Sequence, residues 1–162
     1  MNTIKLNIKK LNEEAIIPKY AKDGDVGMDL YTLEDARINA YETKIVKTGI
    51  AIQLQDGLEA QIRPRSGISL NGCKGCEYIE SNYAKKHPNP YLRVQLGTVD
   101  SNYVGDIGII TYNQEAYDVL IPKGTRLAQM VIAPVSKVEF TEVCKLENTT
   151  RGELGFGSTG IK

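Results

Sequence analysis

The sequence predicts an all-β fold, a β sandwich or jelly roll with Greek-key connections between its strands. Most of the chain consists of short runs in which apolar and polar residues alternate, as they do along a half-buried strand. Glycine, aspartate, asparagine and proline separate these runs, as is typical of turns. The sequence has no long amphipathic pattern, and only residues 79–86 suggest one or two helical turns.

Five runs carry the strand prediction. Residues 4–8 alternate strictly, as expected of a half-buried strand, and residues 49–54 and 91–96 have the same period. Residues 107–112 and 130–135 are richer in β-branched and apolar side chains, which is typical of interior strands. Turn signals separate such runs at Asp23-Gly24, Asp56-Gly57 and Lys123-Gly124.

Length and composition indicate a single intracellular domain. A chain of 162 residues is long enough to bury one hydrophobic core. Twenty basic residues balance twenty acidic ones, which argues against a nucleic-acid or membrane partner. The first ten residues lack the apolar core of a signal peptide, and residues 127–135 are too short to span a bilayer. We therefore expect a cytoplasmic protein, in a host cytoplasm if the gene belongs to a phage. Three cysteines without an export signal argue against a disulfide framework.

Two segments interrupt the strand pattern and set the expected organisation. We expect a β core over residues 1–146, with a polar inserted loop at about residues 71–90, and a flexible tail over residues 147–162. The tail contains four glycines and the run RGELGFGSTG. Its glycines formally satisfy GxGxxG, but a dinucleotide site of that type needs a following helix, and only two residues remain. Two interpretations of the tail remain: its backbone N–H groups form a concavity that binds an anion, or the tail is disordered and only aids solubility.

Four further pieces carry polar groups on predicted turns. Residues 63–67 place two guanidinium groups and a hydroxyl where a strand ends, and such groups bind phosphates. Residues 97–107 are expected to form a β-hairpin with Asp100 at its approach and Tyr103 near its tip. Residues 25–30 carry two carboxylates suited to Mg²⁺, and residues 124–129 lead from a turn to Gln129. Each piece alone is also explained by ordinary turn chemistry.

Taken together and in this order, DVGMDL, PRSG, GTVDSNY, GTRLAQ and RGELGFGSTG resemble motifs one to five of the homotrimeric dUTPases. The resemblance spans residues 25–160, and its most specific parts are the closing tail and the D-x-x-Y hairpin. It implies a β jelly roll, in agreement with the strand pattern. It also implies hydrolysis of dUTP to dUMP and pyrophosphate, which keeps uracil out of DNA and supplies dUMP for thymidylate synthesis.

The resemblance further implies a homotrimer with active sites at its subunit junctions and a role for each matched residue. Asp100 would activate the water that attacks the α-phosphorus, and Tyr103 would pack against the deoxyribose. Backbone groups of the hairpin would read the uracil edge, among them those of Gly97, Val99 and Ile107. Phosphates of a neighbouring chain's site would be held by Arg65, Ser66, Gly67 and Gln129. Asp29 would contact Mg²⁺ through water. The tail would close as a lid, using Arg151, Phe156, Gly157, Ser158 and Thr159.

The connection between Ser66 and Gly97 is longer than in compact members of this family, and the excess falls at the 71–90 insert. That insert contains Cys73, Cys76 and His87. Zinc binding there lacks an evident fourth ligand, so a solvated loop with reduced thiols is the favoured interpretation. The insert is also a candidate for binding a protein partner.

Two other functions remain open from the sequence. A dCTP deaminase, or a bifunctional deaminase and dUTPase, would share the fold, although the Asp100–Tyr103 hairpin and the full tail favour simple hydrolysis. A nucleotide-gated regulatory protein that binds a partner through the insert would also retain every motif. Ammonia release from dCTP distinguishes the first alternative, and nucleotide binding without hydrolysis distinguishes the second.

Overall fold

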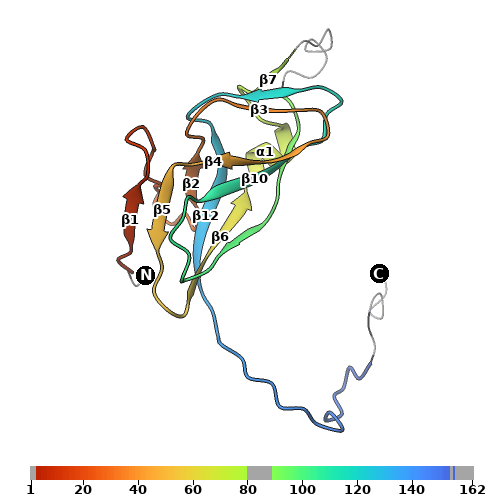
Figure 1. The fold of residues 1–162 in the computed structure, drawn as a ribbon. Helices are drawn as coiled ribbons and strands as arrows, with labels where there is room; N and C mark the ends of the chain where they lie inside the picture. Colours follow the sequence, from red (N-terminus) through yellow and green to blue (C-terminus); the bar gives the residue numbers. More distant parts are fainter. Residues whose placement is uncertain (1–2, 80–88, 154, 156–162) are drawn as a thin grey trace.

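The computed structural model describes residues 3–79, 89–153 and 155 of the chain, and it has the predicted all-β architecture (Figure 1). Its single described helix, α1, has six residues. The elements are, in chain order, β1 (Asn7–Lys10), β2 (Met28–Tyr31), β3 (Ala36–Ile38), β4 (Thr43–Lys47), β5 (Ile50–Gln53), β6 (Leu58–Pro64), α1 (Ser66–Asn71), β7 (Glu77–Tyr78), β8 (Leu92–Val94), β9 (Gly97–Val99), β10 (Gly108–Asn113), β11 (Val119–Ile121) and β12 (Arg126–Pro134).

The strands form four antiparallel sheets that join segments far apart in the sequence. The largest sheet has the order β2-β12-β6-β9, and two others have the orders β4-β10-β8 and β3-β11-β7. A fourth, two-stranded sheet pairs β1 with β5. Because sequence neighbours such as β9 and β10 belong to different sheets, the chain repeatedly crosses between layers, as in a β sandwich.

The core lies between these sheets and is built from alternating side chains. In β10 the pattern of burial changes at every residue, so that Ile109 and Thr111 point inward. β12 contributes Leu127, Ala128, Met130 and Val131, all of them buried. Aliphatic side chains dominate the cluster, which agrees with the β-branched composition of the predicted strands.

The structure corrects the prediction for the first strand. The first strand begins at Asn7 rather than at residue 4, and all four of its residues are exposed rather than half-buried. This strand pairs only with β5. Among the described residues a helix occupies Ser66–Asn71, and residues 80–86 of the suggested helical turns at 79–86 lie outside the described residues.

The segment expected to be a solvated insert is partly built into the core. Cys73 and Cys76 are only 1% and 4% exposed, and they form a disulfide with a Cα–Cα distance of 5.5 Å. The prediction of solvated, reduced thiols is therefore corrected, because a tight turn brings the two thiols together and packs them as small apolar groups. β7 follows at once and pairs with β11. Cys144 is a free, exposed cysteine, and His87 lies outside the described residues.

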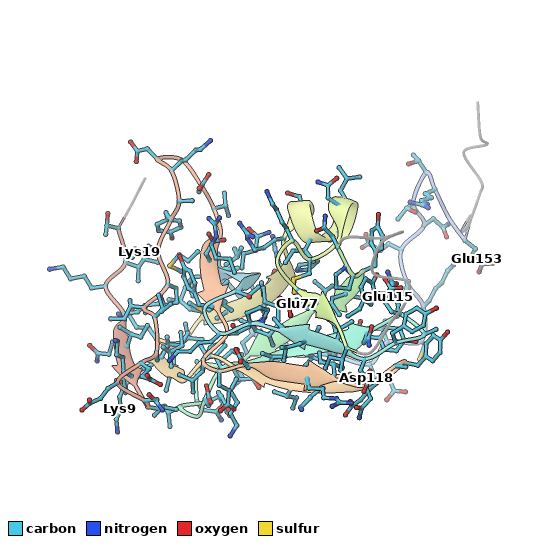
Figure 2. The ribbon with its side chains drawn as sticks, turned by 90° about the horizontal axis from the view of Figure 1, so that it is seen from above. Lys9, Lys19, Glu77, Glu115, Asp118 and Glu153 are labelled. Atoms are coloured by element: carbon cyan, nitrogen blue, oxygen red, sulfur yellow. A yellow bond between two sulfur atoms is a disulfide. The ribbon has the colours of Figure 1, made fainter. Side chains whose placement is uncertain are left out.

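Acidic side chains gather at the β7–β11 end of the molecule. Figure 2 shows Glu77, Glu115 and Asp118 on this side, away from Lys9 and Lys19 near the N-terminal strand. Asp118 precedes β11 and forms an ion pair with Arg37 of β3, with 2.6 Å between Nη2 and Oδ2. The side chains therefore join the two strands in addition to their backbone ladder.

The chain leaves the packed core at the end of β12. Residues 135–146 are exposed and extend away from the sheets (Figure 1). Over residues 3–79, 89–153 and 155, no helix has the length and apolar character needed to cross a membrane.

Candidate active site

A pocket of about 320 Å³ opens where β9 and β10 separate, and the predicted hairpin residues line it. Gly97 and Val99 belong to β9, Asp100 and Tyr103 to the connecting loop, and Ile107 immediately precedes β10. The remaining lining residues are Ile45, Ile62, Thr98, Asp106, Gly108 and Ile110. The five expected residues are thus brought together.

The pocket exists because the two arms of the hairpin pair with different sheets. Val99 of β9 pairs with Ala60 of β6, whereas Ile110 of β10 pairs with Ile45 of β4. The prediction of a simple β-hairpin is corrected accordingly, because β9 and β10 are not neighbours in either sheet. Their separation leaves backbone and side chains of both arms facing a shared space.

Asp100 and Tyr103 lie on the turn that joins the arms. The Tyr103 N–H donates to the Asp100 carbonyl at 3.1 Å, which closes the turn. The Asp100 carboxylate is on an exposed residue and lines the pocket, a position suited to contact a water molecule. The Tyr103 hydroxyl donates to the Asp106 carbonyl at 2.9 Å, so the ring is held along the pocket wall.

Motif reasoning missed the apolar wall that β4 and β10 contribute. Ile45 is 64% exposed although it is a large aliphatic residue, and it lines the pocket together with Ile110. A Cβ on Gly108 would lie 2.4 Å from Ile45 Cγ2, so a glycine is required for this close approach. The alternation of residues 107–112 marks which side chains share a face, but it gives no sign that Ile45 joins them.

The second group of predicted residues forms a charged cluster on β2, β12 and the end of β6. Asp29 is buried, and its carboxylate contacts two guanidinium groups. Arg65 Nε lies 2.8 Å from Oδ1, and Arg126 Nη1 lies 3.3 Å from Oδ2. Two cations share one anion, so the cluster carries one positive charge in excess, which attracts phosphate. Arg126 was not singled out from the sequence because arginines beside turns are common.

Gln129 and the start of α1 border this cluster. The Gln129 amide donates to the Pro64 carbonyl at 2.9 Å. Gly27 leaves room for this side chain, because a Cβ there would lie 2.3 Å from Gln129 Oε1. Ser66 and Gly67 are exposed, and the space beside Gly67 is open. The arrangement presents a hydroxyl and a backbone turn next to the two guanidinium groups.

The structure does not bring the pocket and the charged cluster together within one chain. β2, which carries Asp29, and β9, which carries Gly97, are the opposite edges of the four-stranded sheet. Arg151 of the tail is exposed, and Phe156, Gly157, Ser158 and Thr159 lie outside the described residues. A single chain therefore presents two partial sites.

Other features of the described chain do not add to this site. A larger hollow of about 610 Å³ lies beside β8 and is lined by residues such as Tyr91 and Arg93, none of them predicted for function. Burial, followed by the negative charge of Glu115, raises the pKa of Tyr78 to about 12, so this phenol stays protonated. Among the described residues, no group of three histidine, cysteine, aspartate or glutamate side chains could hold a metal ion.

The chain is similar to known proteins over almost its full length. The family model described as dUTPase matches residues 13–160. The deoxyuridine 5'-triphosphate nucleotidohydrolase of Crocosphaera subtropica is 45% identical over 158 residues, covering 98% of this chain and all of the relative. The protein of the same name from a Hydrogenobaculum strain is 46% identical over 160 residues, with coverage of 98% and 100%.

A solved structure with a similar fold is that of the dUTPase of Staphylococcus bacteriophage 80alpha with dUPNHPP. Its TM-score is 0.82 at 25% sequence identity, and the match covers 98% of this chain and 100% of the phage protein. The similarity extends across the sheets that hold the pocket and the charged cluster.

Proposed function

This chain belongs to the dUTPase family, and we propose that it hydrolyses dUTP to dUMP and pyrophosphate by attack of water on the α-phosphorus. The observation that carries the proposal is the pocket between β9 and β10, which gathers Gly97, Val99, Asp100, Tyr103 and Ile107. In the cell this reaction keeps uracil out of DNA and provides dUMP for thymidylate synthesis.

Asp100 is the proposed general base. Its carboxylate lines the pocket from an exposed turn, where a water molecule can reach it. Removing a proton from that water as it attacks phosphorus raises its nucleophilicity, and a positioned base contributes about 10²–10⁴-fold to a rate. The rest of the acceleration comes from aligning the triphosphate and stabilising its charge.

The walls of the pocket account for the choice of a deoxyuridine nucleotide. Uracil presents an acceptor–donor–acceptor edge, which backbone N–H and C=O groups of the two arms would complement, whereas cytosine exchanges donor and acceptor at positions 3 and 4. Tyr103 is held along the wall by its hydrogen bond to Asp106, where its ring would pack against the deoxyribose and leave no room for a 2′-hydroxyl. The narrow space between β9 and β10 would exclude a methyl group on the base.

The charged cluster is proposed to hold the phosphates of a neighbouring chain's site in a homotrimer. Arg65, Ser66 and Gly67 follow the end of β6 and Gln129 lies on β12, whereas Asp100 follows Val99, which pairs with Ala60 near the start of β6. This separation supports a site completed by a second chain. The tail of a chain would then close over the nucleotide through Arg151, Phe156, Gly157, Ser158 and Thr159.

Mg²⁺ fits this proposal as an ion carried by the triphosphate, with Asp29 contacting one of its waters. The two oxygens of Asp29 each already form an ion pair with a guanidinium group, one with that of Arg65 and one with that of Arg126. A carboxylate has about four lone-pair positions, and those left over can accept from a metal-bound water. Bound in this way, the ion would neutralise phosphate charge.

Pyrophosphate release tests the proposal, with dUTP, dCTP, dTTP and UTP compared in the presence of Mg²⁺ and after chelation. We expect release from dUTP alone and its loss on chelation. Asp100→Asn should keep binding of a non-hydrolysable dUTP analogue while turnover falls by about 10²–10⁴-fold. Near-normal turnover in this variant would refute Asp100 as the base, and ammonia release from dCTP would favour a deaminase.

A further inference from the structure

Asp106 connects the base pocket to the turn at residues 48–50. Its Oδ1 accepts from the Gly49 N–H at 2.9 Å. The next residue is held at the same turn, because the Thr48 hydroxyl donates to the Ile107 carbonyl at 2.6 Å and the Ile107 N–H donates to the Ile50 carbonyl at 2.9 Å. Three hydrogen bonds therefore fix the end of the pocket loop.

The turn is a rigid point of attachment. Gly49 has a φ of +70°, and a Cβ there would lie within 2.9 Å of Leu33 and 3.1 Å of Ala15. Its carbonyl accepts from the Leu11 N–H at 2.8 Å. Thr48 is buried, with 2% of its surface exposed. Packing on both sides therefore fixes the direction of the Gly49 N–H, which donates the hydrogen bond to Asp106.

The backbone of Asp106 positions Tyr103. Its carbonyl accepts from the Tyr103 hydroxyl at 2.9 Å. Gly105 provides the space for this contact, since a Cβ there would lie 2.5 Å from the tyrosine oxygen. The side chain of Asp106 thus sets the position of its own carbonyl, and that carbonyl sets the position of the ring that lines the pocket.

We propose that Asp106 is a positioning residue for sugar discrimination, which acts through Tyr103 and the backbone of Ile107 without touching the reacting atoms. The proposal rests on the role assigned above to Tyr103 against the deoxyribose. Loss of the carboxylate frees the loop, so Tyr103 no longer closes the space that a ribose 2′-hydroxyl would need. An oxygen acceptor at this position is sufficient, because its partners, the Gly49 N–H at 2.9 Å and the Thr48 hydroxyl at 3.4 Å, are both neutral.

The test compares Asp106→Ala and Asp106→Asn in steady-state assays with dUTP and UTP. We expect Asp106→Ala to raise KM for dUTP by roughly tenfold, with a much smaller change in kcat, and to reduce the preference for dUTP over UTP by a similar factor. Asp106→Asn should restore both values, because its amide oxygen can accept from Gly49. Asp118→Ala is the matched control, since Asp118 also accepts a backbone N–H, from Ala40, and does not line the pocket.

Unchanged KM and selectivity in Asp106→Ala, with only a lower Tm as in Asp118→Ala, would overturn the proposal. Failure of Asp106→Asn to restore selectivity would also overturn it. If Asp106→Ala does not fold, Tyr103→Phe tests the proposal instead. This variant loses the hydrogen bond from the tyrosine hydroxyl to the Asp106 carbonyl, and an unchanged preference for dUTP over UTP would overturn the proposal. An inactive wild-type protein would instead refute the proposed function, so the two failures are distinguishable.

Discussion

At the scale of single residues, Asp118 shows how one carboxylate stabilises the β3–β11 side of the molecule. It accepts from Arg37 through Oδ2 and from the Ala40 N–H through Oδ1. The hydrogen bonds from Arg37, followed by that from Ala40, lower the pKa of the Asp118 carboxyl below its ordinary value. The folded protein therefore binds this proton less readily than the unfolded chain does.

The sign of this shift predicts a pH-dependent stability. The contribution of Asp118 is present at neutral pH and is lost as pH falls through its lowered pKa. Asp118→Asn should lower Tm by a few degrees near pH 7, because the pair lies at the surface and is partly screened. The difference from wild type should shrink as the pH is lowered into the acid range. Thermal unfolding of wild type and Asp118→Asn at a series of pH values measures this difference in Tm. A difference that does not change with pH would contradict a lowered pKa for Asp118.

At the scale of elements, the turn after α1 attaches the 71–90 segment to the core. The Gly72 N–H donates to the Ile68 carbonyl, and the Cys73 N–H donates to the Pro90 carbonyl at 2.8 Å. Gly72 has a φ of +76°, and a Cβ there would lie 2.5 Å from the Asn89 carbonyl oxygen. The two ends of the segment therefore meet so closely that a side chain has no space at this position.

Gly72→Ala should destabilise the protein by about 2–3 kcal/mol, since it adds a backbone clash to the cost of a left-handed conformation. Gly75→Ala is the matched control, because Gly75 has a φ of +87° in the same turn with open space around it. Gly75→Ala should lower the free energy of unfolding by about 1 kcal/mol, because the added Cβ also restricts the unfolded chain and so offsets part of the backbone strain. Urea unfolding measures both, and equal losses would show that the contact with Asn89 is unimportant.

At the scale of the whole molecule, the opposite placement of the base pocket and the charged cluster predicts complementation between inactive variants. Asp100→Asn chains retain Arg65, and Arg65→Ala chains retain Asp100. If the chain forms the proposed homotrimer and a site takes Asp100 from one chain and Arg65 from another, assemblies refolded from an equal mixture should contain roughly a quarter of intact sites. Pyrophosphate release from the mixture, with each variant alone as control, measures this recovery. A mixture as inactive as its components would indicate that both residues must come from one chain.

Much of the fold and of the site was determined by the sequence alone. Alternation and turn residues predicted the all-β class and strands at residues 49–54, 107–112 and 130–135, which overlap β5, β10 and the second half of β12, because side-chain period and turn chemistry are local properties. The hairpin motif placed Asp100 and Tyr103 on one turn, and both residues line the pocket between β9 and β10.

Only the tertiary structure decided features that depend on strand pairing across the sequence. It placed β9 and β10 in different sheets, brought Ile45 beside Gly108, and paired Asp29 with Arg65 and Arg126. It also showed that Cys73 and Cys76 are buried, whereas the polar sequence around them predicted a solvated loop. A sequence pattern reports the neighbours of a residue along the chain, whereas these contacts are set by loop closure and packing between segments tens of residues apart.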